Sequence, residues 1–185
     1  MIISFSGDIG SGKSTIAKKI SEKIGYERFY MGQILRDVAK KRKMTLVELL
    51  KKGENDPSID KQIDDLIVKL SKENDNFIIE SRTAWYFIPH SLKIYLKVDE
   101  QEGAKRIFKQ LQSNNERNED RKLLTLEDVV RSNKNRRETD DKRYKTYYGI
   151  DISKMENYNF VLDTTDLSVN DVYNRTLAFI KNQIK

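Results

Sequence analysis

Apolar residues along this chain form short runs that alternate with longer segments in which they recur every three or four positions. Short apolar runs are typical of buried strands, and the three-to-four spacing is typical of helices with one buried face. The pattern predicts strands at 2–5, 27–30, 77–79, 92–98 and 159–162. It predicts helices at 13–24, 33–43, 45–52, 58–74, 100–112, 125–147 and 169–184.

Strands that alternate with helices indicate an α/β fold, with a parallel sheet covered by helices on both faces. Two blocks interrupt the alternation: the helical stretch 33–74 and the charged stretch 103–125. Asparagine-rich residues 112–120 are expected to form a loop or a helix end. Inserts of this kind, placed over the carboxyl edge of a sheet, are natural mobile covers for a site.

The composition fits one globular domain. The chain has 185 residues, of which 37% are hydrophobic and 35% charged, and it has no cysteine. It contains no apolar run of membrane-spanning length and begins directly with a strand-like run, so we expect no membrane partner and a cytoplasmic location. The net charge of +6 favours anionic partners, either nucleic acid or a phosphate-rich small molecule.

Three glycines and a lysine follow the first predicted strand. Gly7, Gly12, Lys13 and Ser14 match the pattern G-x-x-x-x-G-K-[ST], between a strand and a helix. Backbone N–H groups and the helix N-terminus in such a loop cradle the phosphates of a nucleoside triphosphate such as ATP. Lys13 would reach the β- and γ-phosphates, and Ser14 would hold Mg²⁺. The predicted ATP-binding residues are Gly7, Asp8, Ile9, Gly10, Ser11, Gly12, Lys13, Ser14 and Thr15. The alternative is a glycine-rich turn without a ligand.

This motif is called the P-loop, and several other classes of protein that carry it fit this chain less well. The string most similar to a guanine-reading motif, at 133–136, ends in arginine. A transporter-type ATPase needs a signature loop and a longer chain, and a helicase needs a second domain. A small kinase that phosphorylates a small acceptor remains.

Such a kinase needs positive charge around the reacting phosphates and must exclude water. Arg36 lies one turn into the helix after the second strand, and Arg82 follows the third strand. Glu80, at the end of that strand, suits a water-mediated partner of Mg²⁺. The alternative for Glu80 is an exposed acid at a strand end.

One face of the predicted helix 125–147 changes from apolar to polar. Starting at Val129 it carries Asn133, Arg136, Asp140 and Arg143. This face either lines the phosphate cleft, with Asp140 orienting the arginines, or is a solvated face with i,i+4 ion pairs.

The assembled motifs resemble the cytidylate kinase family, most closely its short archaeal-type branch. The resemblance covers nearly the whole chain. Besides the P-loop it includes residues 32–36, 56–60, 80–82, 92–98, 104–107, 136, 142–152 and 161–172.

The resemblance implies the P-loop nucleoside monophosphate kinase fold, with a five-stranded parallel sheet. It implies a single domain with a core at 1–30, 76–105 and 126–185. A nucleoside-monophosphate (NMP)-binding segment would occupy 31–75 and a lid 106–125. In the family pattern, Arg36 and Arg82 would bind the acceptor phosphate. Arg136, Asp140 and Arg143 would contact the acceptor ribose and the phosphates, and Arg106 would lie at the base of the lid.

Several positions depart from the bacterial pattern of that family. Met31 replaces a serine that contacts the acceptor phosphate, and Thr83 replaces an aspartate that helps to read cytosine. Ser81 replaces a usual glycine, and Gly103 replaces an arginine. Since a carboxylate accepts hydrogen bonds from an exocyclic amine, Asp60, Asp64 or Gln62 could take over the reading of the base.

We therefore expect ATP- and Mg²⁺-dependent phosphorylation of CMP or dCMP to CDP or dCDP by a monomer that binds no nucleic acid. A kinase for UMP, AMP or a small metabolite is the first alternative. A P-loop nucleic-acid-binding protein is the second.

Overall fold

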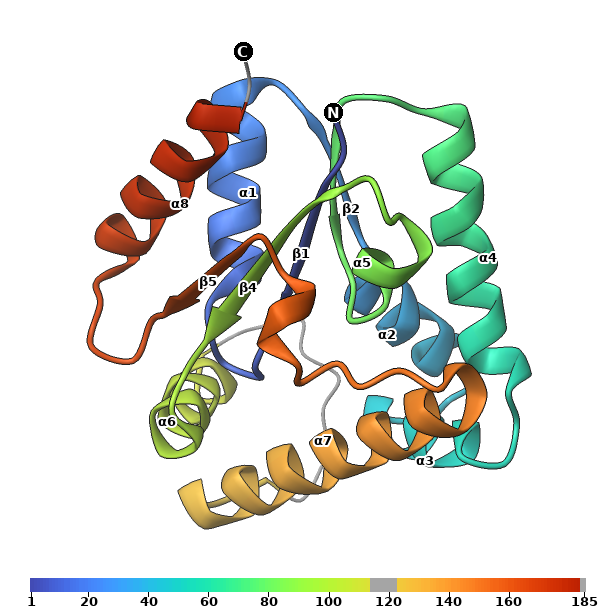
Figure 1. Ribbon diagram of the computed structural model, residues 1–185. Helices are drawn as coiled ribbons and strands as arrows, with labels where there is room; N and C mark the ends of the chain where they lie inside the picture. The colour runs from blue at the N-terminus through green and yellow to red at the C-terminus, as the bar shows by residue number, and fades with distance from the viewer. Residues whose placement is uncertain (114–122, 184–185) are drawn as a thin grey trace.

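A computed structural model describes residues 1–113 and 123–183, and it contains one five-stranded parallel sheet in the order β2-β3-β1-β4-β5 (Figure 1). The strands are β1 (Ile3–Gly7), β2 (Glu27–Tyr30), β3 (Phe77–Glu80), β4 (Leu92–Lys97) and β5 (Phe160–Asp163). The helices are α1 (Lys13–Ile24), α2 (Met31–Lys41), α3 (Leu46–Gly53), α4 (Ser58–Glu73), α5 (Ala84–Phe87), α6 (Glu100–Leu111), α7 (Leu126–Tyr148), a 3-10 turn (Met155–Asn157) and α8 (Val169–Gln183). The predicted α/β class, strand count and parallel sheet are confirmed.

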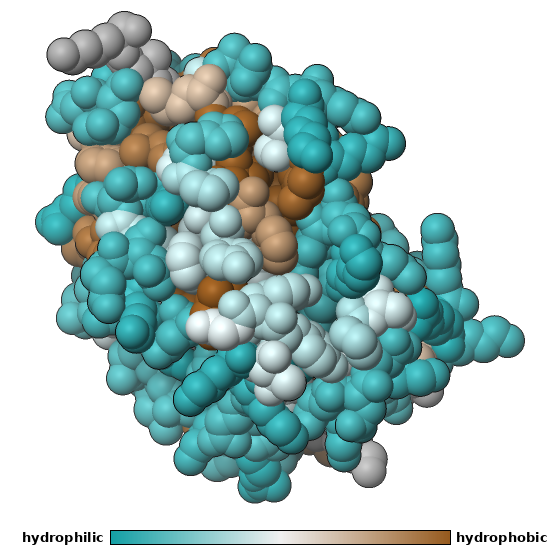
Figure 2. All heavy atoms as spheres, turned by 45° about the vertical axis from the view of Figure 1, so that its right-hand side comes forward, coloured by the Kyte–Doolittle hydropathy of each residue, from teal (hydrophilic) through white to brown (hydrophobic). Residues whose placement is uncertain are grey.

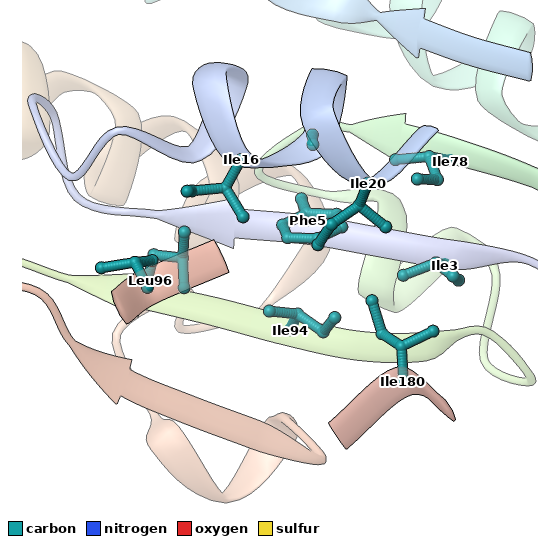
Figure 3. Packing of buried hydrophobic residues seen from close by; sticks show 10 residues of the cluster. Ile3, Phe5, Ile16, Ile20, Ile78, Ile94, Leu96 and Ile180 are labelled. Atoms are coloured by element: carbon teal, nitrogen blue, oxygen red, sulfur yellow. The ribbon is translucent and has the colours of Figure 1, made fainter. Parts of the chain in front are cut away.

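The two faces of the sheet are covered by different helices. Figure 1 shows α1 and α8 on one side and α2, α4 and α5 on the other. Side chains alternate between the faces along each strand: Ile3 and Phe5 pack with Ile16 and Ile20 of α1 (Figure 3), whereas Ile2 packs in the opposite cluster. The four-residue spacing of isoleucines in 13–24 thus places Ile16 and Ile20 in the core, as predicted.

The largest departures from the predicted elements occur where the chain turns sharply. β2 continues into α2 without a loop, so α2 begins at Met31 rather than at 33. The short helix α5 and the 3-10 turn were not predicted, because four or three residues give no measurable periodicity. Residues 114–120 of the predicted asparagine-rich loop lie outside the described residues.

α7 crosses the carboxyl ends of the strands (Figure 1). It begins with a capping box: the Thr125 hydroxyl accepts a hydrogen bond from the Asp128 amide, and the Asp128 carboxylate accepts one from the Thr125 amide. No described helix is long and apolar enough to cross a membrane. On the face shown in Figure 2, hydrophilic side chains cover most of the surface and hydrophobic ones show in only a few areas.

Candidate active site

A cavity of about 890 Å³ opens at the carboxyl edge of the sheet, with the P-loop as part of its wall. Gly10 and Gly12 have left-handed backbone conformations, with φ of 86° and 81°. Because glycine adopts such values without strain, the loop can curl around a ligand and deliver it to the N-terminus of α1. The P-loop residues that line the cavity are Ile9, Gly10, Ser11, Gly12, Lys13, Ser14 and Thr15.

The other two predicted ATP-binding residues, Gly7 and Asp8, line a second, smaller cavity of about 410 Å³ instead. The Asp8 carboxylate accepts hydrogen bonds from the Tyr95 hydroxyl at 2.8 Å and the Val98 amide at 3.1 Å. It also pairs with Arg137 at 3.3 Å. These contacts hold an acidic side chain away from the cavity in which the triphosphate was predicted.

The backbone of the P-loop lies directly against the backbone of α6. A Cβ atom added to Gly10 would lie 2.3 Å from the carbonyl oxygen of Gly103, and one added to Gly103 would lie 2.6 Å from that of Ile9. Real Cβ atoms do not approach backbone so closely, so both positions require glycine. This contact explains the presence of Gly103, which the sequence presented only as a departure from the family pattern.

Four arginines from separate parts of the chain line the large cavity: Arg36, Arg82, Arg106 and Arg136. Arg36 is buried, and its Nη1 donates hydrogen bonds to the Tyr30 hydroxyl and the Gly32 carbonyl, both at 3.0 Å. Burial and the neighbouring charge of Arg136 lower the pKa of Arg82 to about 10, so Arg82 stays positively charged at neutral pH. With Lys13, these side chains make the cavity suitable for a polyanion.

Arg143 is placed differently from the other predicted arginines. It is 2% exposed and is not among the residues that line the cavity. Its Nε and Nη2 donate to the two carboxylate oxygens of Asp60 at 2.8 and 3.2 Å. Its Nη2 also donates to Asp140 at 2.9 Å. In this structure Arg143 therefore ties α7 to α4.

Asp140 joins two of the arginines. It forms ion pairs with Arg82, which follows β3, and with Arg143, one turn along α7. Asp140 is 2% exposed, so the alternative of a solvated face with i,i+4 pairs is wrong for this part of α7. The predicted orienting role of Asp140 agrees with these contacts.

Glu80 and Ser14 form a suitable pair for a divalent cation. Glu80 is 1% exposed, so the alternative of an exposed strand-end acid is wrong. Its Oε1 accepts a hydrogen bond from Arg28 at 2.7 Å, whereas its buried Oε2 has no hydrogen-bond partner among the described residues. Those residues include no cluster of three or more His, Asp or Glu that could hold a metal ion. The donors present fit Mg²⁺, which keeps several waters and takes ligands from substrate phosphates.

Arg106 lines the cavity from α6. Its guanidinium donates to Glu102 at 2.9 Å and to the carbonyl oxygens of Thr164 and Thr165 at 2.8 and 2.9 Å. It thereby connects α6 to the segment between β5 and α8. The predicted lid, 106–125, begins inside α6, and its residues 114–122 lie outside the described part of the chain.

Asp64 and Thr83 lie together in the same cavity, on the side formed by α4 and the start of α5. Asp64 is 5% exposed and accepts hydrogen bonds from the Thr83 hydroxyl, at 2.7 Å, and the Tyr148 hydroxyl. Burial raises the pKa of the Asp64 carboxyl to about 6, although both hydroxyls oppose the shift. The hydrogen bond from Tyr148 to Asp64 left no signal in the sequence.

Comparisons with known proteins agree with this geometry. A model of the cytidylate kinase-like family matches residues 2–166. A cytidylate kinase of Sulfolobus acidocaldarius is 37% identical over 185 residues, covering 99% of this chain and 96% of that protein. A cytidylate kinase of Pyrobaculum aerophilum is 34% identical over 180 residues, covering 97% and 92%.

Solved structures are similar in fold. A shikimate kinase from Acinetobacter baumannii in complex with shikimate matches with a TM-score of 0.61 and 14% identity, covering 100% of this chain and 95% of that chain. An uncharacterised protein from Eubacterium ventriosum matches with a TM-score of 0.71 and 17% identity, covering 98% of both chains.

The Gly10–Gly103 contact predicts an unusual response to a helix substitution. Gly→Ala inside a helix normally stabilises it by about 0.5–1 kcal/mol. In Gly103→Ala the new methyl group must displace the P-loop, so we expect ATP affinity to fall at least about tenfold. Isothermal titration calorimetry with ATP measures this, and Gly53→Ala is the control, because its Cβ meets only ordinary contacts beyond 3.6 Å. Equal ATP affinity in wild type and Gly103→Ala would contradict the prediction.

The raised pKa of Asp64 predicts a pH-dependent cost of burial. The ordinary pKa of an aspartate carboxyl is 3.8 and that of Asp64 in the folded protein is about 6, so wild type loses stability as pH rises between these values. The difference corresponds to roughly 3 kcal/mol. Asp64→Asn has no such titration, and its free energy of unfolding relative to wild type should increase by about that amount from pH 4 to pH 7. Urea unfolding at four pH values measures this. If the difference in free energy of unfolding between Asp64→Asn and wild type stays constant from pH 4 to pH 7, the pKa of Asp64 is not raised by burial.

Proposed function

The chain belongs to the cytidylate kinase-like family, and on this premise we propose that it transfers the γ-phosphoryl group of ATP to CMP or dCMP. The observation that carries the proposal is the single cavity shared by the P-loop and four arginines from distant parts of the chain. A P-loop alone indicates a triphosphate. The additional arginines provide for a second phosphate facing it, which is what a nucleoside monophosphate kinase requires.

The reaction needs no base from the protein. An oxygen of the acceptor phosphate, already an anion at neutral pH, attacks the γ-phosphorus. The bond from that phosphorus to the oxygen bridging the β- and γ-phosphates breaks, and ADP leaves with the electron pair. The protein contributes positioning and compensation of charge at a loose transition state.

The cationic residues of the cavity and the two candidate Mg²⁺-site residues receive roles on this basis. Lys13 and the P-loop amides hold the β- and γ-phosphates, and Arg36 and Arg82 hold the acceptor phosphate. Arg136, from α7, neutralises charge on the group in transfer. Arg106 positions the ATP end of the cavity through its contacts with the β5–α8 segment. Ser14 and, through water, Glu80 would hold Mg²⁺, which when bound neutralises phosphate charge.

Asp140 and Arg143 act as positioning residues in this proposal. Asp140 fixes Arg82, and Arg143 fixes Asp140 while joining α7 to α4. Residues 31–75 form the NMP-binding segment, attached to α7 also by the Tyr147 hydroxyl, which donates to the Gly53 carbonyl at 2.8 Å. The predicted lid, 106–125, would exclude water that would otherwise hydrolyse ATP; its residues 114–122 lie outside the described part of the chain.

A panel of acceptors tests the proposed function. With ATP and Mg²⁺, coupled detection of ADP should give the highest kcat/KM for CMP or dCMP, above UMP, AMP and shikimate. Lys13→Ala should abolish turnover, because it removes the cation at the β- and γ-phosphates, and should leave the melting temperature unchanged.

Two results would contradict this proposal. Faster turnover of another acceptor would show a kinase of different specificity. Absence of turnover, together with steeply salt-dependent binding of an oligonucleotide, would favour the nucleic-acid-binding alternative.

Two arginines of α7 should respond differently to replacement by alanine. Arg136→Ala should lower kcat by about 10³-fold, as for arginines that face a transferring phosphoryl group. Arg143→Ala should lower the free energy of unfolding by about 3–5 kcal/mol, because Asp60 loses its buried counter-ion and Asp140 keeps only Arg82. Urea unfolding and steady-state kinetics separate the two effects.

Lys142→Ala serves as the control, since the neighbouring Lys142 side chain is 71% exposed. Less than a tenfold loss of kcat in Arg136→Ala would remove Arg136 from the reacting phosphates. Unchanged stability in Arg143→Ala would contradict the assigned role of the buried ion pairs.

A further inference from the structure

Among the described residues, the cavity contains one buried carboxylate with no cation against it. Asp64 is 5% exposed and lines the cavity, and within residues 1–113 and 123–183 no Lys or Arg forms an ion pair with it. Its hydrogen-bond donors are two neutral hydroxyls, those of Thr83 and Tyr148. Burying a carboxylate with only neutral donors is costly, and the raised pKa of Asp64 reflects that cost. Such a group is typical of a functional site.

The two other candidates for reading the base are unsuitable in this structure. Both carboxylate oxygens of Asp60 accept hydrogen bonds from Arg143, which neutralises its charge. Gln62 is exposed and does not line the cavity. Asp64 thus remains as the acceptor that can contact a ligand.

The chemistry of Asp64 selects for an N–H donor. An ionised carboxylate accepts about four hydrogen bonds and donates none. Thr83 occupies one site on Oδ1 and Tyr148 one on Oδ2, so each oxygen can accept another hydrogen bond. Cytosine presents an amine at C4, whereas uracil presents a carbonyl oxygen there. The amine would donate to Asp64, and the carbonyl oxygen would meet its lone pairs.

The two hydroxyls also fix the direction of the carboxylate. Thr83 is 2% exposed. The Tyr148 ring is held by four other rings, with its centroid 5.3 Å from that of Phe87, 6.3 Å from those of Tyr86 and Tyr147, and 6.4 Å from that of Tyr144. A recognition group is effective when its supporting residues are themselves immobile.

We propose that Asp64 determines base specificity by accepting a hydrogen bond from the exocyclic amine of the acceptor base, with Thr83 and Tyr148 as positioning residues. This inference rests on the proposed function, because it assumes that a nucleoside monophosphate occupies the acceptor end of the cavity. It assigns the discrimination between amino- and oxo-pyrimidines to α4, with support from α7 and from the segment after β3.

A pair of ligands that differ only in the amine tests the proposal. CMP and the 5′-monophosphate of pyrimidin-2-one riboside, which has hydrogen in place of the amine, are titrated calorimetrically into wild type and variants. Wild type should bind CMP at least about tenfold more tightly than the analogue. Asp64→Ala should bring the two affinities within about twofold, by weakening CMP binding alone. Asp65→Ala is the matched control, since the Asp65 side chain is 66% exposed, and should behave as wild type.

Two further variants keep the test decisive if Asp64→Ala is unstable. Asp64→Asn preserves the size of the side chain and adds an N–H donor for a carbonyl oxygen, so kcat/KM for UMP relative to CMP should rise about tenfold. Tyr148→Phe keeps the ring packing and removes one hydroxyl. It should reduce the preference for CMP over the analogue about threefold, with unchanged ATP affinity.

The possible results separate the role of Asp64 from the proposed function. CMP turnover by wild type, combined with equal weakening of both ligands in Asp64→Ala, would reject the role of Asp64 and leave the proposed function intact. Equal affinity of wild type for CMP and the analogue would also reject the role of Asp64 and leave the proposed function intact. Absence of CMP turnover in the acceptor panel would reject the proposed function, and this inference with it.

Discussion

The site depends on the burial of the Arg143 guanidinium at the junction of α4 and α7. A buried cation is tolerated only when its charge is paired and its N–H groups are bonded. Asp60 and Asp140 meet this requirement from two different elements, and Asp140 in turn pairs with Arg82. One chain of charges therefore joins α4, α7 and the segment after β3, and it fixes the position of Arg82 in the wall of the cavity.

A second constraint is steric and acts on the ATP side. The P-loop approaches α6 so closely that neither Gly10 nor Gly103 has room for a side chain. A movement of α6 therefore reaches the phosphate-binding loop through backbone contact, without intervening flexible side chains. Since Arg106 ties the same helix to the β5–α8 segment, α6 contacts both that segment and the P-loop.

The features that were predicted correctly are those that short stretches of sequence determine. The five parallel strands, the long helices and the P-loop follow from periodicity and from one specific motif, and the structure confirms the fold. The sequence did not reveal that Asp8 turns away from the cavity or that Arg143 is buried. Both outcomes depend on partners far along the chain, Tyr95 for Asp8 and Asp60 for Arg143. Residue type and spacing predicted a set of arginines, but only tertiary packing separates those that face the cavity from the one that supports them.

The fold itself does not determine the acceptor, as the likeness to a shikimate kinase at 14% identity shows. Arginines and P-loop amides recognise phosphate, which every acceptor nucleotide carries, so they cannot distinguish among bases. Discrimination requires a polar group whose unpaired state is costly and whose direction is fixed. Asp64 meets both conditions, because it is buried among neutral donors and held by Thr83 and Tyr148. The cation-rich part of the cavity thus supplies affinity and charge compensation. The uncompensated carboxylate of Asp64 supplies selectivity. The stability lost by burying this carboxylate is the physical cost of that selectivity.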